Sequence, residues 1–302
     1  MSCSVLIPTY NRPDDLQRCL DSILTQDVLP AEILIIDDGD LMPDIQARLA
    51  TRVGGQGIRW AYRKKDHTHE RRGLSESKNI GLSLVSEPLC CIFDDDVVLE
   101  PGFLRAVLAP FAEDNSPQLI AVGGVIVNSR QISRVERVFN ALFGLVGTCA
   151  WDVNESGFQV WDDAILQRQR GYYTHGGVCV VRVSVARQFP FRVFHGGRTA
   201  LEDVTFYAEA KKAGHYVYVE PQARLVHNEA PVSRDREALV GYKESANRCE
   251  LFGILHPIPT NRQRAAFARA VIGWILRQVL AGHWQKAWGM VQGLRNKALV
   301  VR

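Results

Sequence analysis

The stretch Leu89-Cys90-Cys91-Ile92-Phe93-Asp94-Asp95-Asp96 decides both the fold and the expected site. Its apolar part, residues 89–93, predicts a short buried strand. Three carboxylates follow at once, and adjacent like charges repel one another when a cleft removes their hydration. A divalent cation relieves this repulsion, because Mg²⁺ and Mn²⁺ prefer carboxylate oxygens and share their other positions with phosphates. We predict a metal and nucleotide-phosphate site here, at the carboxyl end of a strand; the alternative is a solvated acidic turn.

Strand and helix patterns alternate over the first 127 residues. Strands are predicted at 4–7, 32–36, 58–62, 89–93 and 119–127, and helices at 13–24, 75–85 and 101–111. Pro13 suits a first helical turn, and we expect Ser75 to cap its helix. Further on, helices are predicted at 134–146 and 202–212, and strands at 178–181, 216–219 and 224–226. The pattern is typical of an α/β protein with a doubly wound, mostly parallel nucleotide-binding sheet.

The composition of the 302 residues, 46% of them hydrophobic, allows one large domain or one domain with an appendage. The seven cysteines include no C-x-x-C pair, and several lie in apolar runs, which favours reduced core residues of a cytoplasmic protein. A strand-like run begins at Ser4, so we expect no signal peptide. The sequence contains no run of about 18 apolar residues, so we predict no helix that spans a membrane.

The net charge of +3 is unevenly distributed. Residues 251–302 contain eight basic and no acidic side chains, whereas residues 1–250 contain 28 basic and 33 acidic ones, a net charge of −5. Basic and apolar residues alternate from Arg262, which predicts two amphipathic helices broken near Gly282. Such helices with tryptophan lie in anionic membrane interfaces, so we expect segment 262–302 to contact one. The alternative is a helical hairpin packed on the core. We expect no nucleic-acid partner, since no known motif accompanies the charge.

Four further groups of residues are candidates for chemistry. Asp37 and Asp38 follow the second strand and could accept hydrogen bonds from a base or a ribose, or form an acidic turn before a glycine. Arg71, Arg72 and Lys78 could pair with a pyrophosphate, or form a solvated basic surface. The pair Glu202-Asp203 begins a helix, where acids are favoured by the helix dipole alone. The last candidate is His227, which ends a predicted strand.

These motifs together, in this order, resemble the family 2 glycosyltransferases, whose fold is called GT-A. The resemblance covers about residues 3–250 and is carried by Pro8-Thr9-Tyr10-Asn11-Arg12, Asp37-Asp38-Gly39, Ser77-Lys78-Asn79-Ile80-Gly81, Asp94-Asp95-Asp96, Gly176-Gly177 with Arg182, Glu202-Asp203 and His227. It implies metal-dependent, inverting transfer of a sugar from a UDP-, GDP- or dTDP-sugar to a hydroxyl. A saccharide or lipid-linked saccharide of a cell envelope or exopolysaccharide is the expected acceptor, and the cytoplasmic face of a membrane the expected location.

The resemblance also implies roles for individual residues. The donor would be held by Pro8, Thr9, Tyr10, Arg12, Asp37, Asp38, Arg72, Lys78, Asp94 and Asp95, with Asp95 at the ribose. The metal, Mn²⁺ or Mg²⁺, would be bound by Asp94, Asp96 and His227. Asp203 would be the catalytic base, with Glu202 beside it. The catalytic domain would span residues 1–250, with a nucleotide-sugar half at 1–127 and an acceptor half at 128–250, and residues 251–302 would form the tail.

Three other classes of protein remain as alternatives. A nucleotidyltransferase acting on sugar phosphates needs a glycine-rich loop after the first strand, where Pro8-Thr9-Tyr10-Asn11 stands here. A calcium-binding module needs a turn glycine and spaced ligands, which residues 94–99 lack. A non-catalytic sugar-binding protein needs no metal-dependent nucleotide site. The long charged loop before Ser77 contains His67-Thr68-His69, for which a second metal is a minor alternative.

Overall fold

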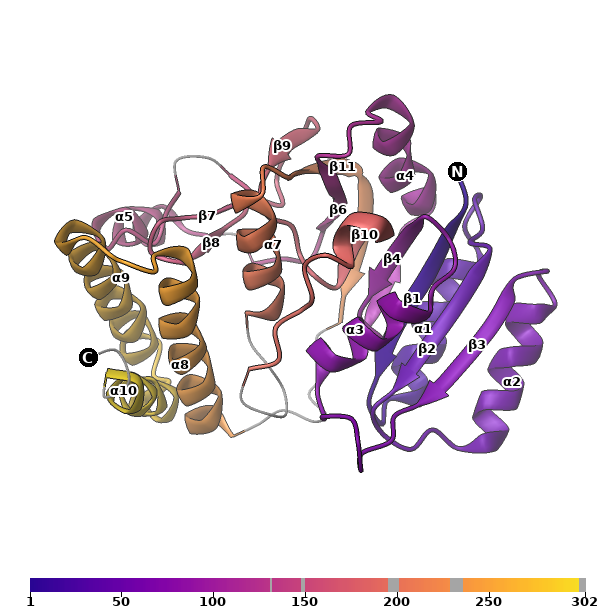
Figure 1. The fold of residues 1–302 in the computed structure, drawn as a ribbon, viewed down its shortest axis with the longest axis horizontal. Helices are drawn as coiled ribbons and strands as arrows, with labels where there is room; N and C mark the ends of the chain where they lie inside the picture. Colours follow the sequence, from indigo (N-terminus) through magenta and orange to yellow (C-terminus); the bar gives the residue numbers. More distant parts are fainter. Residues whose placement is uncertain (131, 148–149, 195–200, 229–235, 299–302) are drawn as a thin grey trace.

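The computed structural model describes residues 1–130, 132–147, 150–194, 201–228 and 236–298, whose arrangement is shown in Figure 1. Cys149 and the last four residues of the predicted tail lie outside the described residues. The first half contains β1 Cys3–Thr9, α1 Pro13–Leu24, β2 Glu32–Asp37, α2 Pro43–Gly54, β3 Arg59–Lys64, α3 Leu74–Leu84, β4 Leu89–Phe93, β5 Val97–Leu99, α4 Phe103–Glu113 and β6 Leu119–Ile126. The second half contains α5 Arg134–Leu142, β7 Asp152–Val153, β8 Gln159–Val160, β9 Gln169–Gly171, β10 Val178–Arg182, α6 Val183–Ala186, α7 Glu202–Lys212, β11 Tyr216–His227, α8 Glu237–Leu255, α9 Asn261–Leu280 and α10 Trp284–Ala298.

One large sheet organises the described residues, with the strand order β3-β2-β1-β4-β10-β6-β11-β5 and β9 paired to β11. The strands β3, β2, β1 and β4 are mutually parallel, β10 is antiparallel to both of its neighbours, and β11 is parallel to β6. The predicted doubly wound α/β architecture is confirmed, and the second half adds antiparallel strands to it. The direction of winding reverses between β1 and β4, and such switch points are where open α/β sheets bind ligands.

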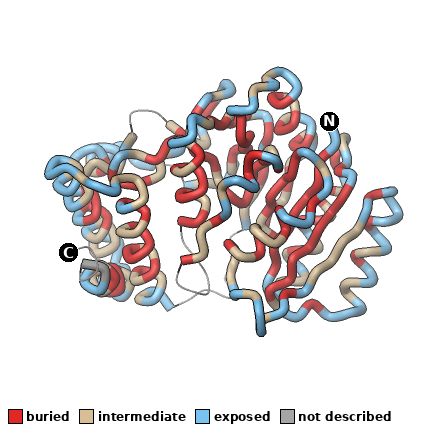
Figure 2. The backbone as a smooth tube through the Cα atoms, in the orientation of Figure 1, coloured by how far each residue is buried: buried red, intermediate tan, exposed pale blue. Residues whose placement is uncertain are grey.

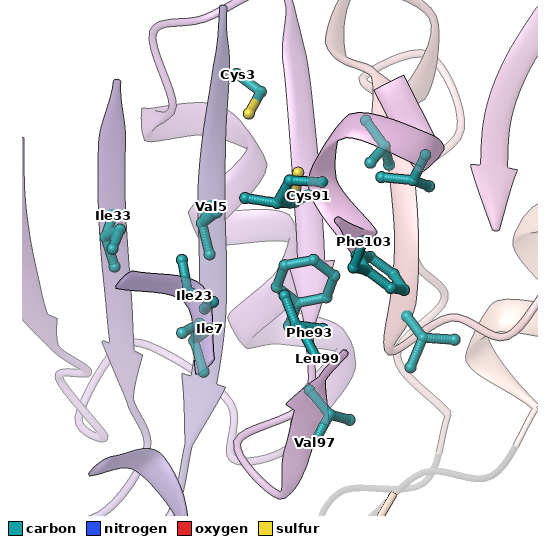
Figure 3. Close-up of a cluster of buried hydrophobic side chains, with 14 of the residues drawn as sticks. Cys3, Val5, Ile7, Ile23, Ile33, Cys91, Phe93, Val97, Leu99 and Phe103 are labelled. Atoms are coloured by element: carbon teal, nitrogen blue, oxygen red, sulfur yellow. The ribbon is translucent and has the colours of Figure 1, made fainter. Parts of the chain in front are cut away.

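The core follows from the two-residue period of the strands. Val5 and Ile7 of β1 pack with Cys91 and Phe93 of β4 on the face covered by α1, α2 and α4 (Figure 3). The intervening Leu6, with Cys90 and Ile92, packs on the opposite face against α3, α6 and α7. Both faces are therefore buried, and Figure 2 shows the central strands buried along their length. This explains why the strand sequences are continuously apolar, as expected for parallel sheets.

Three predicted elements differ from the structure in detail. The cap expected at Ser75 is wrong: α3 begins at Leu74, its N-cap is Gly73 at φ 116°, and Ser75 is buried inside the first turn. The helix expected over 134–146 ends at Leu142, because Gly144 adopts φ 68° and leaves the helical region. The two strands expected after Tyr216 form one strand, β11, whose register with β6 shifts between residues 219 and 224.

The predicted tail forms two helices joined at Gly282, which adopts φ 81°. Helix α8 runs across the boundary expected at residue 250, and α10 packs closely against it. A Cβ at Gly289 would lie 1.8 Å from the carbonyl oxygen of Ala238, so glycine permits this approach. Helix α9 packs through Trp274 against Phe158. The packed-hairpin alternative thus describes how the helices lie, and contact with a membrane stays a prediction.

Candidate functional site

The candidate site lies along the edge of the sheet where its parallel strands end. β1 ends at Thr9, β2 at Asp37, and β4 at Phe93, directly before the acidic triplet. β11 ends there too, because its last residue, His227, pairs with Val97. The edge therefore gathers the motifs that the sequence spreads over more than 200 residues, beside the switch point between β1 and β4.

Asp94, Asp96 and His227 form the candidate metal site. One possible ligand atom of each lies within 4.8 Å of the others, and no other group of three such side chains occurs in the described parts of the chain. Asp96 Oδ1 lies 3.0 Å from His227 Nε2, and the Asp96 side chain is only 7% exposed. Two carboxylates and an imidazole suit a small divalent cation such as Mn²⁺, with positions left for other oxygens. The donor set therefore fits the predicted cation.

Arg12 and Thr9 hold the middle of the acidic triplet. Arg12 Nη1 lies 2.9 Å from both Asp95 Oδ1 and Asp96 Oδ2, and Thr9 Oγ1 donates to Asp95 Oδ2 at 2.7 Å. Burial raises the pKa of Asp95 to about 7, although Arg12 and Thr9 oppose the shift. Thr9 and Arg12 were predicted to hold the donor, and here they orient carboxylates. The contact of Asp95 with a ribose stays a prediction.

Asp37 and Asp38 end β2 in two different surroundings. Asp37 is fully buried and accepts hydrogen bonds from Gly39 N, Leu41 N and Tyr62 Oη, each at 2.8 Å. These donors fix the turn after β2, and contact of Asp37 and Asp38 with a nucleoside stays a prediction. Asp38 accepts from Gly73 N at 2.7 Å and is paired with the buried Lys65 at 2.9 Å.

The loop from 65 to 73 is thereby tied to β2. His67 Nε2 lies 3.1 Å from the backbone oxygen of Asp38, and His69 Nδ1 lies 2.8 Å from Asp66. Lys65 was not identified from the sequence; its position directly after the third strand, opposite the acids of β2, is the signal that could have found it. The other predicted donor residues lie nearby: Pro8 is buried in β1, Tyr10 is 37% exposed beyond it, and Arg72 is exposed.

Gly176 and Gly177 bring the metal site and the predicted base together. Gly177 accepts a hydrogen bond from Asp94 N at 2.9 Å, and a Cβ on Gly177 would lie 2.1 Å from Asp94 Oδ2. A Cβ on Gly176 would lie 2.5 Å from the Cβ of Asp203. No larger residue fits either position without displacing a carboxylate. The glycine pair therefore contacts both acids, Asp94 through Gly177 and Asp203 through Gly176.

The two acids at the start of α7 have different partners. Asp203 is half-buried and accepts from Tyr173 Oη at 3.2 Å and from Gly176 N at 3.4 Å. Glu202 is buried and paired with Lys78 at 3.1 Å. Burial alone would lower the pKa of Lys78, but the carboxylates of Glu202, Asp94 and Asp203 outweigh it and raise the pKa to about 12. Lys78 is thus a buried cation between both acid clusters, and its pairing with a diphosphate stays a prediction.

A cluster around His175 was missed by the sequence reasoning. His175 Nε2 lies 3.4 Å from Asp163 Oδ1, and the His175 ring meets the edges of Trp151, Trp161 and Tyr173. Asp163 also accepts from the backbone N–H of Ile126, at the end of β6. The signal in the sequence is that His175 directly precedes the glycine pair. The cluster lies next to Asp203, because Tyr173 contacts both.

Comparison with known proteins places the chain in a family. A sequence model described as Glycosyl transferase family 2 matches residues 4–169, more than half of the chain. Glycosyltransferase GlyA of Streptococcus pneumoniae is 29% identical over 120 residues, 40% of this chain and 16% of that protein. The glucosyl-dolichyl phosphate glucuronosyltransferase of Haloferax volcanii is 26% identical over 154 residues, 49% of this chain and 45% of that protein. The chain therefore matches less than half of the length of either relative.

Solved structures share the fold at low sequence identity. A mannosyltransferase from Pyrobaculum calidifontis in complex with GDP-Man and Mn²⁺ superposes with a TM-score of 0.58 at 16% identity, covering 98% of this chain and 80% of that one. GalNAc-T7 with UDP, GalNAc and Mn²⁺ gives a TM-score of 0.62 at 14% identity, covering 88% of this chain and 49% of that one. The match to the family model, together with this shared architecture, shows that the chain belongs to glycosyl transferase family 2 and has the GT-A fold.

Proposed function

We propose that the protein is a metal-dependent, inverting glycosyltransferase that moves a sugar from a nucleotide-sugar to a hydroxyl acceptor. The observation that carries the proposal is the convergence of two acid groups on Gly176-Gly177. Asp94, which lies with Asp96 and His227, contacts Gly177, and Asp203 contacts the neighbouring Gly176. Direct displacement of a nucleoside diphosphate needs charge neutralisation at the leaving group and a base at the attacking hydroxyl. The two acid groups match those two needs.

The donor would bind at the strand ends around β1. The neighbouring solved structures hold GDP-Man, UDP or UDP-GlcNAc, and we expect a UDP-, GDP- or dTDP-sugar here. Asp94, Asp96 and His227 would hold Mn²⁺ or Mg²⁺, which when bound would supply Lewis-acid neutralisation of the diphosphate. Arg12 keeps the Asp95 and Asp96 carboxylates in fixed positions.

Asp203 would take the proton from the acceptor hydroxyl. As that proton leaves, the acceptor oxygen forms a bond to the anomeric carbon on the face opposite the breaking bond to phosphate, which inverts the configuration. Hydrogen bonds from Tyr173 and Gly176 hold the Asp203 carboxylate in one orientation, as efficient proton transfer requires. The ammonium group of Lys78, which is paired with Glu202, is buried close enough to interact with both Asp94 and Asp203.

The acceptor would lie against the segment 128–173. Trp161 is 41% exposed and lies with its ring 5.7 Å from that of His175, beside the cluster that reaches Asp203. An exposed indole offers a flat apolar face with a polar N–H, which suits the face of a saccharide. A saccharide or a lipid-linked saccharide is the proposed acceptor.

We also propose that segment 262–302 contacts an anionic membrane surface. Its support is the absence of acidic residues after Glu250 and the exposure of Trp284 (65%) and Trp288 (59%) on α10. Among the helices of the described residues, none combines the length and the apolar composition needed to cross a bilayer. A location at the cytoplasmic face of a membrane follows from the same proposal.

The test is an assay of the purified protein against a panel of UDP-, GDP- and dTDP-sugars, with Mn²⁺, with Mg²⁺ and with a chelator. We expect slow hydrolysis of one donor that requires the metal, and faster consumption when the matching acceptor is added. A nucleotidyltransferase would instead form a nucleotide-sugar from a nucleoside triphosphate and a sugar phosphate. A sugar-binding protein would bind without turnover. Either result would replace the proposal.

A further inference from the structure

Two helices far apart in the sequence carry stripes of exposed aliphatic side chains. On α5 and α9 six such side chains are between 40% and 79% exposed: Val135, Val138, Leu142, Ile272, Leu276 and Leu280. They recur at three- and four-residue spacing, so each helix presents one apolar stripe along its outer side. Isolated exposed apolar residues are ordinary on a protein surface, but contiguous sets mark interaction sites.

Helices α5 and α9 lie at the same end of the molecule (Figure 1). Gly273 of α9 lies against Phe143 at the end of α5, where an added Cβ would be 2.3 Å from the Phe143 Cβ. Arg269, one turn earlier in α9, reaches the following Gly144, where an added Cβ would be 2.8 Å from its guanidinium. These contacts fix the C-terminal end of α5 against the middle of α9.

The positions of α9 that make these contacts, Arg269 and Gly273, are four residues apart and therefore lie on one side of the helix. Positions 272, 276 and 280 adjoin them around the helix, away from the buried positions 270, 271 and 274. The exposed stripes of both helices are together called the α5–α9 face.

The charges of the two segments that carry the α5–α9 face, residues 128–147 and 261–280, are almost all positive. Six arginines of these two segments are exposed: Arg130, Arg134, Arg137, Arg262, Arg264 and Arg269. Glu136 is the sole acid between residues 128 and 147, and it is paired with Arg130 at 2.9 Å. An apolar strip bordered by arginine and lacking free acidic residues is complementary to a surface with an apolar interior and negative head groups.

We propose that the α5–α9 face binds in the interface of an anionic lipid bilayer, with both helices lying parallel to the membrane plane. The proposal adds α5, which lies outside segment 262–302, to the membrane-contacting surface. It expects α5 and α9 to contribute equally to membrane binding. The valines and leucines would enter the region between head groups and acyl chains, and the arginines would remain among lipid phosphates. The proposal concerns where the protein binds and does not depend on sugar transfer.

The test is sedimentation of the full chain with vesicles of phosphatidylcholine, alone or mixed with phosphatidylglycerol. We expect the wild-type protein to bind the mixed vesicles at low salt and to dissociate as salt is raised. The variant Val135→Ser/Val138→Ser/Leu142→Ser should bind about tenfold more weakly or worse, as should Ile272→Ser/Leu276→Ser/Leu280→Ser. The matched control is Leu29→Ser/Met42→Ser/Leu84→Ser, which removes three exposed apolar side chains elsewhere and should bind like the wild type.

Two results would overturn the proposal. The first is α5 and α9 variants that bind mixed vesicles as the wild type does while Trp284→Ser/Trp288→Ser does not, which would assign the contact to α10. The second is a wild-type protein that ignores the vesicles but is a dimer by light scattering, with an α5 variant that is monomeric; a second copy would then cover the face. Circular dichroism checks that each variant is folded. Donor hydrolysis, measured without vesicles, reports on the proposed function separately and should be unchanged in the α9 variant.

Discussion

Two acidic clusters end the two strands that flank β1, and the protein treats them in opposite ways. At the end of β2, Asp37 receives three hydrogen bonds from its own turn and Tyr62, and Asp38 receives Lys65 and Gly73 N. At the end of β4, the acidic triplet meets His227 of β11 and Arg12 of the turn after β1.

The two clusters differ in where the hydrogen-bond donors to their carboxylates come from. Backbone N–H groups and a phenol that point at Asp37 satisfy its charge within the fold, so the carboxylate stabilises the turn. The β4 cluster instead brings two carboxylates and an imidazole within 4.8 Å, an arrangement that favours a cation. Similar acidic sequences after similar strands can therefore be a structural turn or a binding site, and the partners contributed by distant residues decide which.

The largest expected effect comes from Asp96. Asp96→Asn removes one anionic ligand, so we expect sugar transfer to fall about a thousandfold or more, equal to several kcal/mol of transition-state stabilisation. Donor binding should lose its dependence on Mn²⁺, measured by calorimetry with and without chelator, while thermal unfolding shows an intact fold. The control is Asp44→Asn, at an exposed position in the first turn of α2. Transfer by Asp96→Asn at the wild-type rate after metal is removed and returned would make the β4 cluster as structural as the β2 cluster.

The second prediction distinguishes the roles of the two acids at the start of α7. Asp203→Asn keeps the shape but removes the basicity, so transfer should fall about a hundredfold or more, with metal-dependent donor binding nearly intact. Glu202→Gln leaves Lys78 buried without its ion-pair partner, so the free energy of unfolding should fall by about 3 kcal/mol while the transfer rate changes less. The two readouts are initial rates and urea unfolding. If Glu202→Gln loses transfer and Asp203→Asn does not, the assignment of the base is reversed.

Loss of transfer in neither variant would move the base elsewhere. Asp152, Asp162 and Asp163 are the alternatives considered from the sequence. Asp152 is paired with Lys211 at 2.6 Å, and Asp162 is exposed. Asp163 faces His175 next to the glycine pair, so Asp163→Asn would be the variant to assay next.

The sequence predicted the nucleotide half of the fold well, because its signals are local. Alternating strand and helix periods over residues 1–127 need no knowledge of distant contacts, and neither does the inference that a charged triplet after a buried strand needs a counter-ion. The segment 128–173 resisted prediction because it contains strands of two residues, such as β7 and β8, whose period is too short to detect. The spacing of apolar residues in α5 predicts a helix. Which side of that helix is exposed depends on its contact with α9, which the local sequence does not show.

Partners across long separations could not be predicted either. Lys78 and Glu202 are 124 residues apart, and nothing in either local sequence indicates that they pair. Asp37 and Asp38 look equally suited to a nucleoside, but the N–H groups that occupy Asp37 appear only once the turn is folded. The glycine pair was recognised as a motif, whereas its physical reason, contact with Asp94 and Asp203, comes from the fold.

A third, smaller effect tests that contact. Gly177→Ala places a methyl group 2.1 Å from Asp94 Oδ2, so the carboxylate must move. We expect the affinity for Mn²⁺ in the presence of donor to fall about tenfold, the scale for disturbing the orientation of a metal ligand. The matched control is Gly253→Ala in α8, where no atom lies within 4 Å of the added Cβ. Equal Mn²⁺ affinities for the two variants would show that Asp94 is not held by the glycine pair.

We expect the smallest effect on sugar transfer from a change at Asp37. This variant tests whether the β2 cluster differs in role from the β4 cluster. Asn keeps one oxygen but turns an amide N–H₂ toward donors, so Asp37→Asn should lower the free energy of unfolding by about 1–3 kcal/mol. Transfer rates and donor affinity should stay close to wild type, because the lost hydrogen bonds lie within the turn. Asp40→Asn is the matched control: Asp40 is exposed and paired with the exposed Lys64, so its loss should leave the free energy of unfolding nearly unchanged. Urea unfolding and donor titration distinguish the outcomes. A variant with unchanged stability but weakened donor binding would return Asp37 to the nucleoside site that its sequence motif implies, and the β2 cluster would then be a binding site as well.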